Sequence, residues 1–424
     1  MARGAAEGMV GDVADGAAAT APRRVVVTGA TGFIGSAVVR KLLSYPNSDS
    51  VFPLSVQLRA VARKPPEPAG APGFLPSPGF LSSPGSLPSS GPLPSPESHP
   101  PPEPLTFPGS LRPSPPPPRP DTIVPVEWVT ADLADPASLR GVCEGADALL
   151  HLASDIGRDE ERCELVNVRG TAALVGEAVR AGVGRIVQLS TAAVYGAGPH
   201  AGPGVGEVEP APLSPASRTR LAAERPVLEA GGTVLRPGLV LGAGDRWVVP
   251  ALAELLHRVP ARWDGGRGLL SVVAVEDLAR LFARLALAPT AVPGGVYHAS
   301  HPVPARNGDL MDTLIGHGVL PRPGAISPQG ATSPRDGPGS VLASGPVLAS
   351  GPVLAPDLSW DACLERLDAV PGRVSERQFA LLARDHWYRS DEVWKVAGCD
   401  PGPGPLVRLA EAADWYRSHL QARA

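Results

Sequence analysis

A glycine-rich turn near the start of the chain constrains the fold more than any other stretch. Residues 28–35 read TGATGFIG, after a short β-branched segment at 24–27 and before a segment at 36–43 whose apolar residues recur at helical spacing. This order predicts a strand, a tight turn and a helix. Glycine suits such a turn because it tolerates unusual backbone angles and lets the backbone approach a pyrophosphate. The phosphates would then lie on the free N–H groups of the helix N-terminus.

Strand and helix patterns alternate through the first half of the chain. Strand patterns occupy 54–62, 126–130, 146–154, 185–190 and 232–236, and helical patterns occupy 136–144, 159–181 and 217–229. This alternation predicts an α/β fold with a doubly wound parallel sheet. Pro226 should end or kink the helix at 217–229 because proline lacks an N–H group.

Composition indicates that part of the chain does not pack into a core. The 424 residues include 52 prolines and 48 glycines, and the prolines concentrate at 65–120 and 322–356, where they occur with glycine, serine and short repeats. Such segments cannot bury enough apolar surface to offset the loss of chain entropy. We expect a disordered insertion at 65–120, a disordered linker at 322–356 and a disordered leader at 1–22. Docking of the proline-rich tract to an aromatic groove is the less favoured alternative.

Charge and cysteine content narrow the class of protein. The net charge is −4 and no run of Lys or Arg is present, so neither nucleic acid nor an anionic membrane surface is an expected partner. No apolar run is long enough to span a bilayer. The four cysteines are widely spaced, which favours neither a zinc site nor a disulfide framework, and no metal is expected. A cytoplasmic location is the resulting expectation.

Several motifs, taken in order along the chain, resemble the extended short-chain dehydrogenase/reductase superfamily, in its NAD-dependent epimerase/dehydratase group. The turn TGATGFIG is similar to the cofactor loop of that family. Asp132-Leu133, Leu152-Ala153, the stretch STAAVYG at 190–196 and Arg236-Pro237-Gly238 resemble its later motifs. Segments 385–391 and 415–417 are similar to substrate-domain segments, including those of its 3β-hydroxysteroid-dehydrogenase-like branch.

The resemblance implies a domain plan and site residues. A Rossmann-like NAD(P)-binding domain would comprise 23–64 and 121–238, and a small C-terminal α/β substrate-binding part would comprise 239–321 and 357–424. Thr191 would hydrogen-bond the substrate carbonyl and Pro237 would lie by the nicotinamide. The implied cofactor-binding residues are Gly29, Thr31, Gly32, Phe33, Ile34, Gly35, Asp132, Leu133, Leu152, Ala153 and Pro237. A homodimer is expected by analogy only.

The residue after the second strand pattern bears on the choice of cofactor. An acidic residue there would hold the adenosine ribose hydroxyls, whereas a cation accommodates a 2′-phosphate. Arg63 occupies this place, which favours NADP(H) with NAD(H) as the alternative. The competing interpretation is that Arg63 is an ordinary solvated loop charge.

The chain departs from the family at its proton donor, a Tyr followed four residues later by a Lys. Ala216 stands at the Tyr position and Arg220 at the Lys position. Arg220 could hold ribose hydroxyls, but an arginine is a poor acid at neutral pH. The remaining donors are a water molecule, a substrate hydroxyl, or a protein group such as Tyr195 or Asp155, both of which are more typical of structural roles.

Two hypotheses of function follow. The first is an atypical oxidoreductase, ketoreductase-like or epimerase-like, with Thr191 and Arg220 in its active site. Its substrate would be a small metabolite such as a nucleotide sugar, a steroid-like compound or a polyketide. The second is a catalytically silent NADP(H)-binding sensor or scaffold. His151, at the end of an apolar strand pattern, is expected to be a hydrogen-bonded core histidine.

Overall fold

A seven-stranded parallel sheet forms the centre of the computed structural model, which describes residues 23–44, 56–65, 126–290, 292–321 and 357–422. The strand order is β12-β7-β5-β4-β1-β2-β3. These strands are β1 (Arg23–Thr28), β2 (Val56–Ala62), β3 (Val126–Thr130), β4 (Ala148–His151), β5 (Arg185–Leu189), β7 (Thr233–Arg236) and β12 (Gly295–His298). The expected Rossmann-like α/β fold is confirmed. The expectations for 1–22, 66–120 and 322–356 fall outside the described residues.

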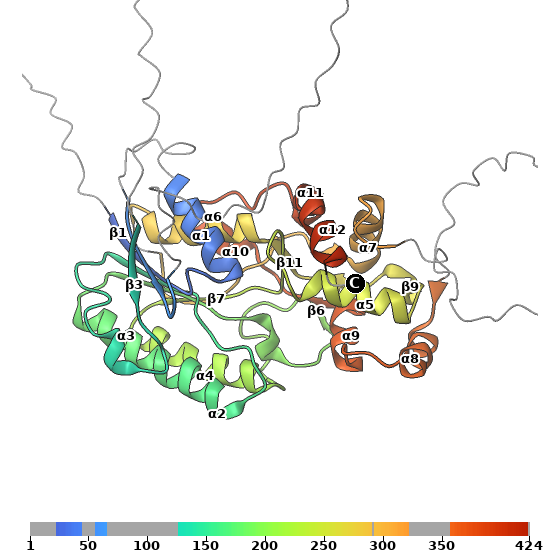
Figure 1. The fold of residues 1–424 in the computed structure, drawn as a ribbon, viewed down its shortest axis with the longest axis horizontal. Helices are drawn as coiled ribbons and strands as arrows, with labels where there is room; N and C mark the ends of the chain where they lie inside the picture. The colour runs from blue at the N-terminus through green and yellow to red at the C-terminus, as the bar shows by residue number, and fades with distance from the viewer. Residues whose placement is uncertain (1–22, 45–55, 66–125, 291, 322–356, 423–424) are drawn as a thin grey trace, which may run out of the picture. The chain divides into compact units, whose positions relative to one another are not determined.

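Helices cover both faces of the sheet (Figure 1). On one face α1 (Phe33–Ser44) packs against α6 (Val275–Leu287). On the other face a continuous helical run consists of α2 (Glu160–Cys163), the π-helical stretch η3 (Glu164–Arg169) and α3 (Gly170–Arg180), and it packs against α4 (Pro215–Glu229). Chain crossovers therefore run to both sides, as a doubly wound sheet requires.

Two expected helices differ from the structure. The pattern at 136–144 forms only a 3₁₀ turn, η2 (Pro136–Leu139), because Gly141 turns the chain with φ of +78°. Helix α4 does not end at Pro226 but continues to Glu229. Pro226 lies in the last turn, where one missing N–H costs a single intrahelical bond, and its own carbonyl still accepts from the N–H of Ala230.

The chain beyond residue 238 forms a second group of elements and also returns to the sheet. Strand β12 extends the sheet beside β7, and α6 covers it. Short strands pair as β8 (Leu239–Leu241) with β11 (Val272–Ala274), β14 (Asp357–Leu358) with β9 (Arg262–Trp263), and β13 (Ala305–Arg306), β10 (Leu269–Leu270), β15 (His386–Trp387) and β6 (His200–Ala201) in one small sheet.

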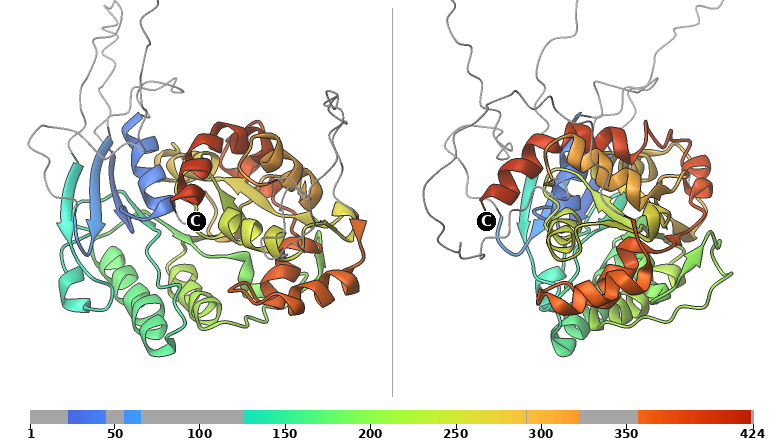
Figure 2. Two further views of the ribbon diagram at one scale, coloured as in Figure 1. Left: turned by 45° about the vertical axis from the view of Figure 1, so that its right-hand side comes forward. Right: turned by 90° about the vertical axis from the view of Figure 1, so that its right-hand side faces the viewer.

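Helices complete this second group. They are α5 (Val248–Arg258), α7 (Asn307–Gly316), α8 (Trp360–Ala369), α9 (Glu376–Ala383), α10 (Asp391–Val396), α11 (Pro405–Glu411) and α12 (Ala413–Gln421). All of them except α10, which packs against β12, contribute to a core of their own. Trp263, Phe379 and Tyr416 are its largest buried side chains. Helices α7, α11 and α12 lie next to one another beside the parallel sheet (Figure 2). Within the described residues, no helix combines the length and apolar character needed to cross a membrane.

Candidate active site

The glycine turn lies at the crevice between the carboxyl ends of strands β1 and β4. Strands β1 and β4 are neighbours, and the chain leaves them toward opposite edges of the sheet. Ligands of open α/β sheets bind at such a switch point, outside the carboxyl ends of the strands. Gly29 has φ of +71°, and a Cβ on it would come within 2.8 Å of the Ala153 backbone nitrogen. Glycine at this position therefore allows the turn after β1 to touch the segment after β4.

Two cavities meet at this turn. The first measures about 240 Å³ and the second about 830 Å³. Residues shared by both linings are Gly29, Thr31, Gly32, Leu152 and Ser154. The backbone N–H groups at the start of α1 thus lie between two hollows, an arrangement that suits an extended ligand with phosphates at its middle.

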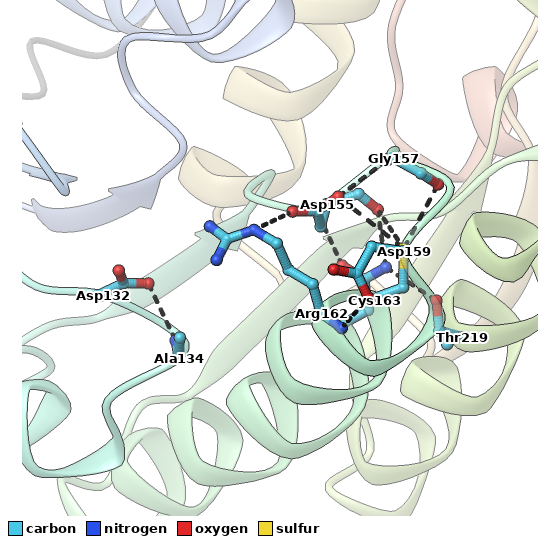
Figure 3. Close-up of polar contacts among 9 residues, drawn as sticks. Asp132, Ala134, Asp155, Gly157, Asp159, Arg162, Cys163 and Thr219 are labelled. Atoms are coloured by element: carbon cyan, nitrogen blue, oxygen red, sulfur yellow. Dashed lines mark hydrogen bonds and ion pairs between the residues drawn. The ribbon is translucent and has the colours of Figure 1, made fainter.

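The first cavity lies over β1, β2 and β3. Of the residues predicted from the sequence it is lined, besides the shared ones, by Arg63, Asp132, Leu133 and Ala153. Arg63 is exposed and has no ion pair among the described residues. The Asp132 carboxylate accepts a hydrogen bond from the backbone N–H of Ala134 at 3.0 Å (Figure 3), which fixes the turn after β3.

Arg162 is a second cation at the first cavity, and the sequence argument did not identify it. Its Nε donates to Asp155 at 2.9 Å, and both residues line the cavity (Figure 3). Asp155 in turn is held by Asn167, whose side chain bonds both the backbone N–H and the carbonyl of Asp155, at 2.7 and 2.8 Å. Asp155 is thus an ion-paired loop residue.

The second cavity contains the other predicted residues. It is lined by Phe33, Ile34, Gly35, Thr191, Arg220 and Pro237, in addition to the shared residues. Thr191 follows β5, and its hydroxyl accepts from the backbone N–H of Ala193 at 3.2 Å. The N–H of Ala192 donates to the carbonyl of Pro237 at 2.8 Å, which ties the end of β5 to the end of β7. The structure therefore brings every predicted site residue into one of two adjoining cavities.

Arg220 reaches the second cavity from α4. Its Nη2 donates to the carbonyls of Leu189 and Ser190 at 3.0 and 2.6 Å, while its buried Nε has no hydrogen-bond partner. Burial lowers the pKa of Arg220 to about 10, against the opposing effect of Glu224. The guanidinium remains charged at neutral pH.

A buried polar network lies behind the second cavity. The Ser190 hydroxyl donates to Glu224, whose carboxylate also accepts from Arg236 Nε and Nη2 at 2.9 and 2.5 Å. Arg236 Nη1 donates to the Tyr195 hydroxyl at 2.8 Å, and that hydroxyl lies 2.7 Å from His298 Nε2. Burial raises the pKa of Tyr195, with Arg236 opposing this effect. Tyr195 thus faces the network rather than either cavity.

His151 is the hydrogen-bonded core histidine that the sequence predicts. Its Nδ1 and Nε2 lie 2.8 and 2.9 Å from the hydroxyls of Thr28 and Thr171, and the residue is 1% exposed. Burial lowers the pKa of His151 to about 4, so the ring is neutral at physiological pH.

Sequence reasoning missed an anchor on the far side of the second cavity. The buried Asp245 carboxylate accepts from the backbone N–H groups of Trp247, Val248 and Val249 at 2.8 to 3.0 Å. The Tyr416 hydroxyl donates to the same carboxylate at 3.2 Å and accepts from the N–H of Gly242 at 2.8 Å. An aspartate just before an apolar helical run is an N-cap signal, so Asp245 was within reach of the sequence; its partner Tyr416 was not.

Comparison with known proteins extends these observations. Residues 93–299 match the model of the NAD dependent epimerase/dehydratase family. The chain is 30% identical over 216 residues to the 2-alkyl-3-oxoalkanoate reductase of Stenotrophomonas maltophilia, covering 47% of this chain and 65% of that protein. It is 26% identical over 210 residues to the 3beta-hydroxysteroid-dehydrogenase/decarboxylase isoform 2 of Arabidopsis thaliana, covering 45% and 37%. The matches thus span less than two thirds of these relatives.

Solved structures share the fold at lower identity. A short-chain dehydrogenase/reductase superfamily protein from Agrobacterium tumefaciens with bound NAD aligns with a TM-score of 0.55 at 18% identity, covering 95% of this chain and 99% of that one. RMD from Pseudomonas aeruginosa, complexed with NADPH, aligns with a TM-score of 0.52 at 17% identity, covering 94% and 98%. At such identity the likeness shows the fold.

Proposed function

Because its residues 93–299 match the model of the NAD-dependent epimerase/dehydratase family, we propose that the protein is an atypical NAD(P)-dependent oxidoreductase. Its substrate is a carbonyl or alcohol group of a small metabolite. The observation that carries this proposal is the pair of adjoining cavities, which meet at the glycine turn and between them are lined by every residue that the family resemblance implies. The names of the two relatives, a reductase and a dehydrogenase/decarboxylase, support the same reaction class.

The residues fit a nicotinamide dinucleotide. Its pyrophosphate would rest on the N–H groups around Gly32, because Gly29 leaves no side chain there. The adenosine half would contact Arg63, Asp132, Leu133 and Ala153, and the nicotinamide half would lie by Thr191 and Pro237. When bound, the nicotinamide ring donates or accepts the hydride.

Thr191 and Arg220 are the two residues that would contact the substrate and the nicotinamide ribose. The Thr191 hydroxyl, half-buried at the end of β5, would donate to the substrate oxygen and orient it. Arg220 holds the end of β5 through two carbonyls, and its unpartnered Nε would hold a ribose hydroxyl. Since Tyr195 and Asp155 are both engaged elsewhere, the proton would come from a water molecule or a substrate hydroxyl.

Single-turnover oxidation of NADPH with a panel of ketones tests the proposal. Substrate-dependent oxidation should be seen with the wild type and fall by about 100-fold in Thr191→Ala, because a positioned hydrogen bond to the reacting oxygen is lost. Thr313→Ala is the matched control, since Thr313 lies on α7 outside both cavities and should leave the rate unchanged. Equal rates in wild type and Thr191→Ala would contradict the role of Thr191.

A catalytically silent NADP(H)-binding protein is the second candidate. Ala216 favours it, because no tyrosine stands at the place of the family's proton donor. Tight NADPH binding with no turnover of any ketone would support this candidate over the enzyme.

Arg63 decides the proposed preference for NADP(H). It is exposed at the first cavity with no carboxylate bound to it among the described residues, so a 2′-phosphate could pair with it. Arg63→Ala should weaken NADP(H) binding by about tenfold and leave NAD(H) binding unchanged. Lys64→Ala is the control, since Lys64 is exposed but lies outside the lining. Calorimetry showing tighter NAD(H) binding by the wild type would overturn the preference.

Restoring the family's pair probes the rest of the site. Ala216→Tyr combined with Arg220→Lys should raise the rate of ketone reduction, by about 10²–10⁴ if the new hydroxyl is positioned as a general acid. Ala216→Phe with Arg220→Lys is the control, because it adds the ring without the acid. Equal rates for the two double variants would show that the geometry around α4 does not support this chemistry.

A further inference from the structure

The second cavity has a large aromatic side chain at its rim. Trp247 lines this cavity, yet 68% of its surface is exposed to solvent. An exposed tryptophan of this extent is costly to hydrate and is typical of a contact surface.

The backbone that carries Trp247 is fixed. Its N–H donates to Asp245 at 2.8 Å, and the next two N–H groups bond the same carboxylate, so Trp247 is held in a set position directly before helix α5. Tyr416 holds Asp245 and Gly242 from α12. The exposure of Trp247 is therefore part of the folded arrangement.

A second exposed apolar residue lines the same cavity from another element. Ile156, in the segment after β4, is 54% exposed. Its neighbour Asp155 is fixed at both backbone groups by Asn167, which itself donates to Thr219 at 2.9 Å. Val240 and Val248 are half-buried and line the cavity as well. We call these four residues, Ile156, Val240, Trp247 and Val248, the apolar rim.

One cation accompanies the apolar rim. Arg246 lines the cavity, is exposed, and has no ion pair among the described residues. The neighbouring acid in the lining, Asp245, accepts from three N–H groups and Tyr416, and it forms no ion pair with Arg246. Arg220, the other cation of this lining, is committed to two backbone carbonyls. Arg246 is thus placed to bind an anion beside an apolar surface.

We propose that this cavity takes an amphiphilic monocarboxylate: an alkyl chain or fused ring that covers the apolar rim, with a carboxylate on Arg246 and the reacting oxygen at Thr191. The proposal rests on the proposed function for the position of the reacting group. A nucleotide sugar fits less well, because its diphosphate brings at least two charges to a single free cation and its hydroxyls would face Trp247 and Ile156.

Binding of unreactive probes tests the proposal without turnover. We expect calorimetry on the full chain to show that decanoate binds more tightly than its uncharged methyl ester by about tenfold, because the ester cannot pair with Arg246. Each methylene added from octanoate to decanoate should tighten binding by about fourfold, as burial of apolar surface requires. UDP-glucose should bind more weakly than decanoate.

Substitutions of Arg246 and Trp247 test whether these two residues bind the probes. Arg246→Gln should abolish the difference between decanoate and its ester, whereas Arg246→Lys should keep most of it. Trp247→Ala should weaken both probes by about tenfold, and Trp247→Phe by less. Arg306→Gln is the matched control, because Arg306 is likewise an exposed arginine just before a helix, in this case α7, and lies outside the cavity. It should change neither probe.

Separate measurement of NADP(H) binding distinguishes the two proposals. If the dinucleotide binds but decanoate does not, or if decanoate binds equally to wild type, Arg246→Gln and Trp247→Ala, the substrate class is wrong and the oxidoreductase proposal stands. Tighter binding of UDP-glucose than of decanoate would also overturn it. If no nicotinamide dinucleotide binds, the proposed function itself fails.

Discussion

At the scale of single residues, two glycines with opposite surroundings show what the turn after β1 requires. Gly29→Ala should lower the free energy of unfolding by about 2 kcal/mol or more, because φ of +71° strains an L side chain and the new Cβ would press on Ala153. It should also weaken NADP(H) binding. Urea unfolding and calorimetry would measure the two effects.

Gly176→Ala is the matched control. Gly176 is exposed on α3, and a Cβ there would meet nothing within 4 Å. This substitution should raise the free energy of unfolding by about 0.5–1 kcal/mol, since alanine favours the helix. A Gly29→Ala protein as stable and as competent in binding as Gly176→Ala would show that the turn does not depend on glycine.

At the scale of elements, helix α4 places two charged side chains, Arg220 and Glu224, at the end of β5. The contribution of Glu224 to the free energy of unfolding can be tested. Glu224→Gln should lower the free energy of unfolding by about 3 kcal/mol, because it leaves the buried Arg236 without its counter-charge. Glu229→Gln, one turn further on, breaks only an exposed ion pair with Arg225 and should produce no measurable change. Similar losses in both variants would contradict the importance of the buried pair.

The strand ends were predictable from the sequence, and the partners across elements were not. Gly29, Asp132, Thr191 and Pro237 each follow a strand pattern and Leu152 lies near the end of one. The carboxyl ends of parallel strands meet at one edge, so these residues had to come together. The Glu224–Arg236 pair depends on which face of α4 meets β7, which periodicity does not specify. Pairing of Asp245 with Tyr416 spans 171 positions and depends on how α12 packs.

At the scale of the whole molecule, buried neutral histidines make the free energy of unfolding depend on pH. Burial lowers the pKa of His151, His298 and His386 to about 4, below the ordinary value of 6.5. Between these values the unfolded chain binds more protons than the folded one, so the free energy of unfolding falls as the pH drops from 6.5 to 4. Each histidine contributes a slope of about 1.4 kcal/mol per pH unit at most.

Denaturant titrations across this range test the prediction. His298→Gln should reduce the slope relative to the wild type, since one of the histidines whose pKa is lowered by burial is gone. His257→Gln, at an exposed position on α5, should leave the slope unchanged. A wild-type stability that is flat between pH 6.5 and 4 would be inconsistent with neutral histidines in the core.

The hydrogen bond from Tyr416 to Asp245 affects the order in which the parts of the two cavities form during synthesis of the chain. Thr191, Arg220 and Arg246 all leave the ribosome well before Tyr416, yet the loop that carries Arg246 gains its hydroxyl support only when α12 docks. The glycine turn and the cavities around it can therefore begin to form early in the nascent chain. The wall of the second cavity at Arg246 is completed last.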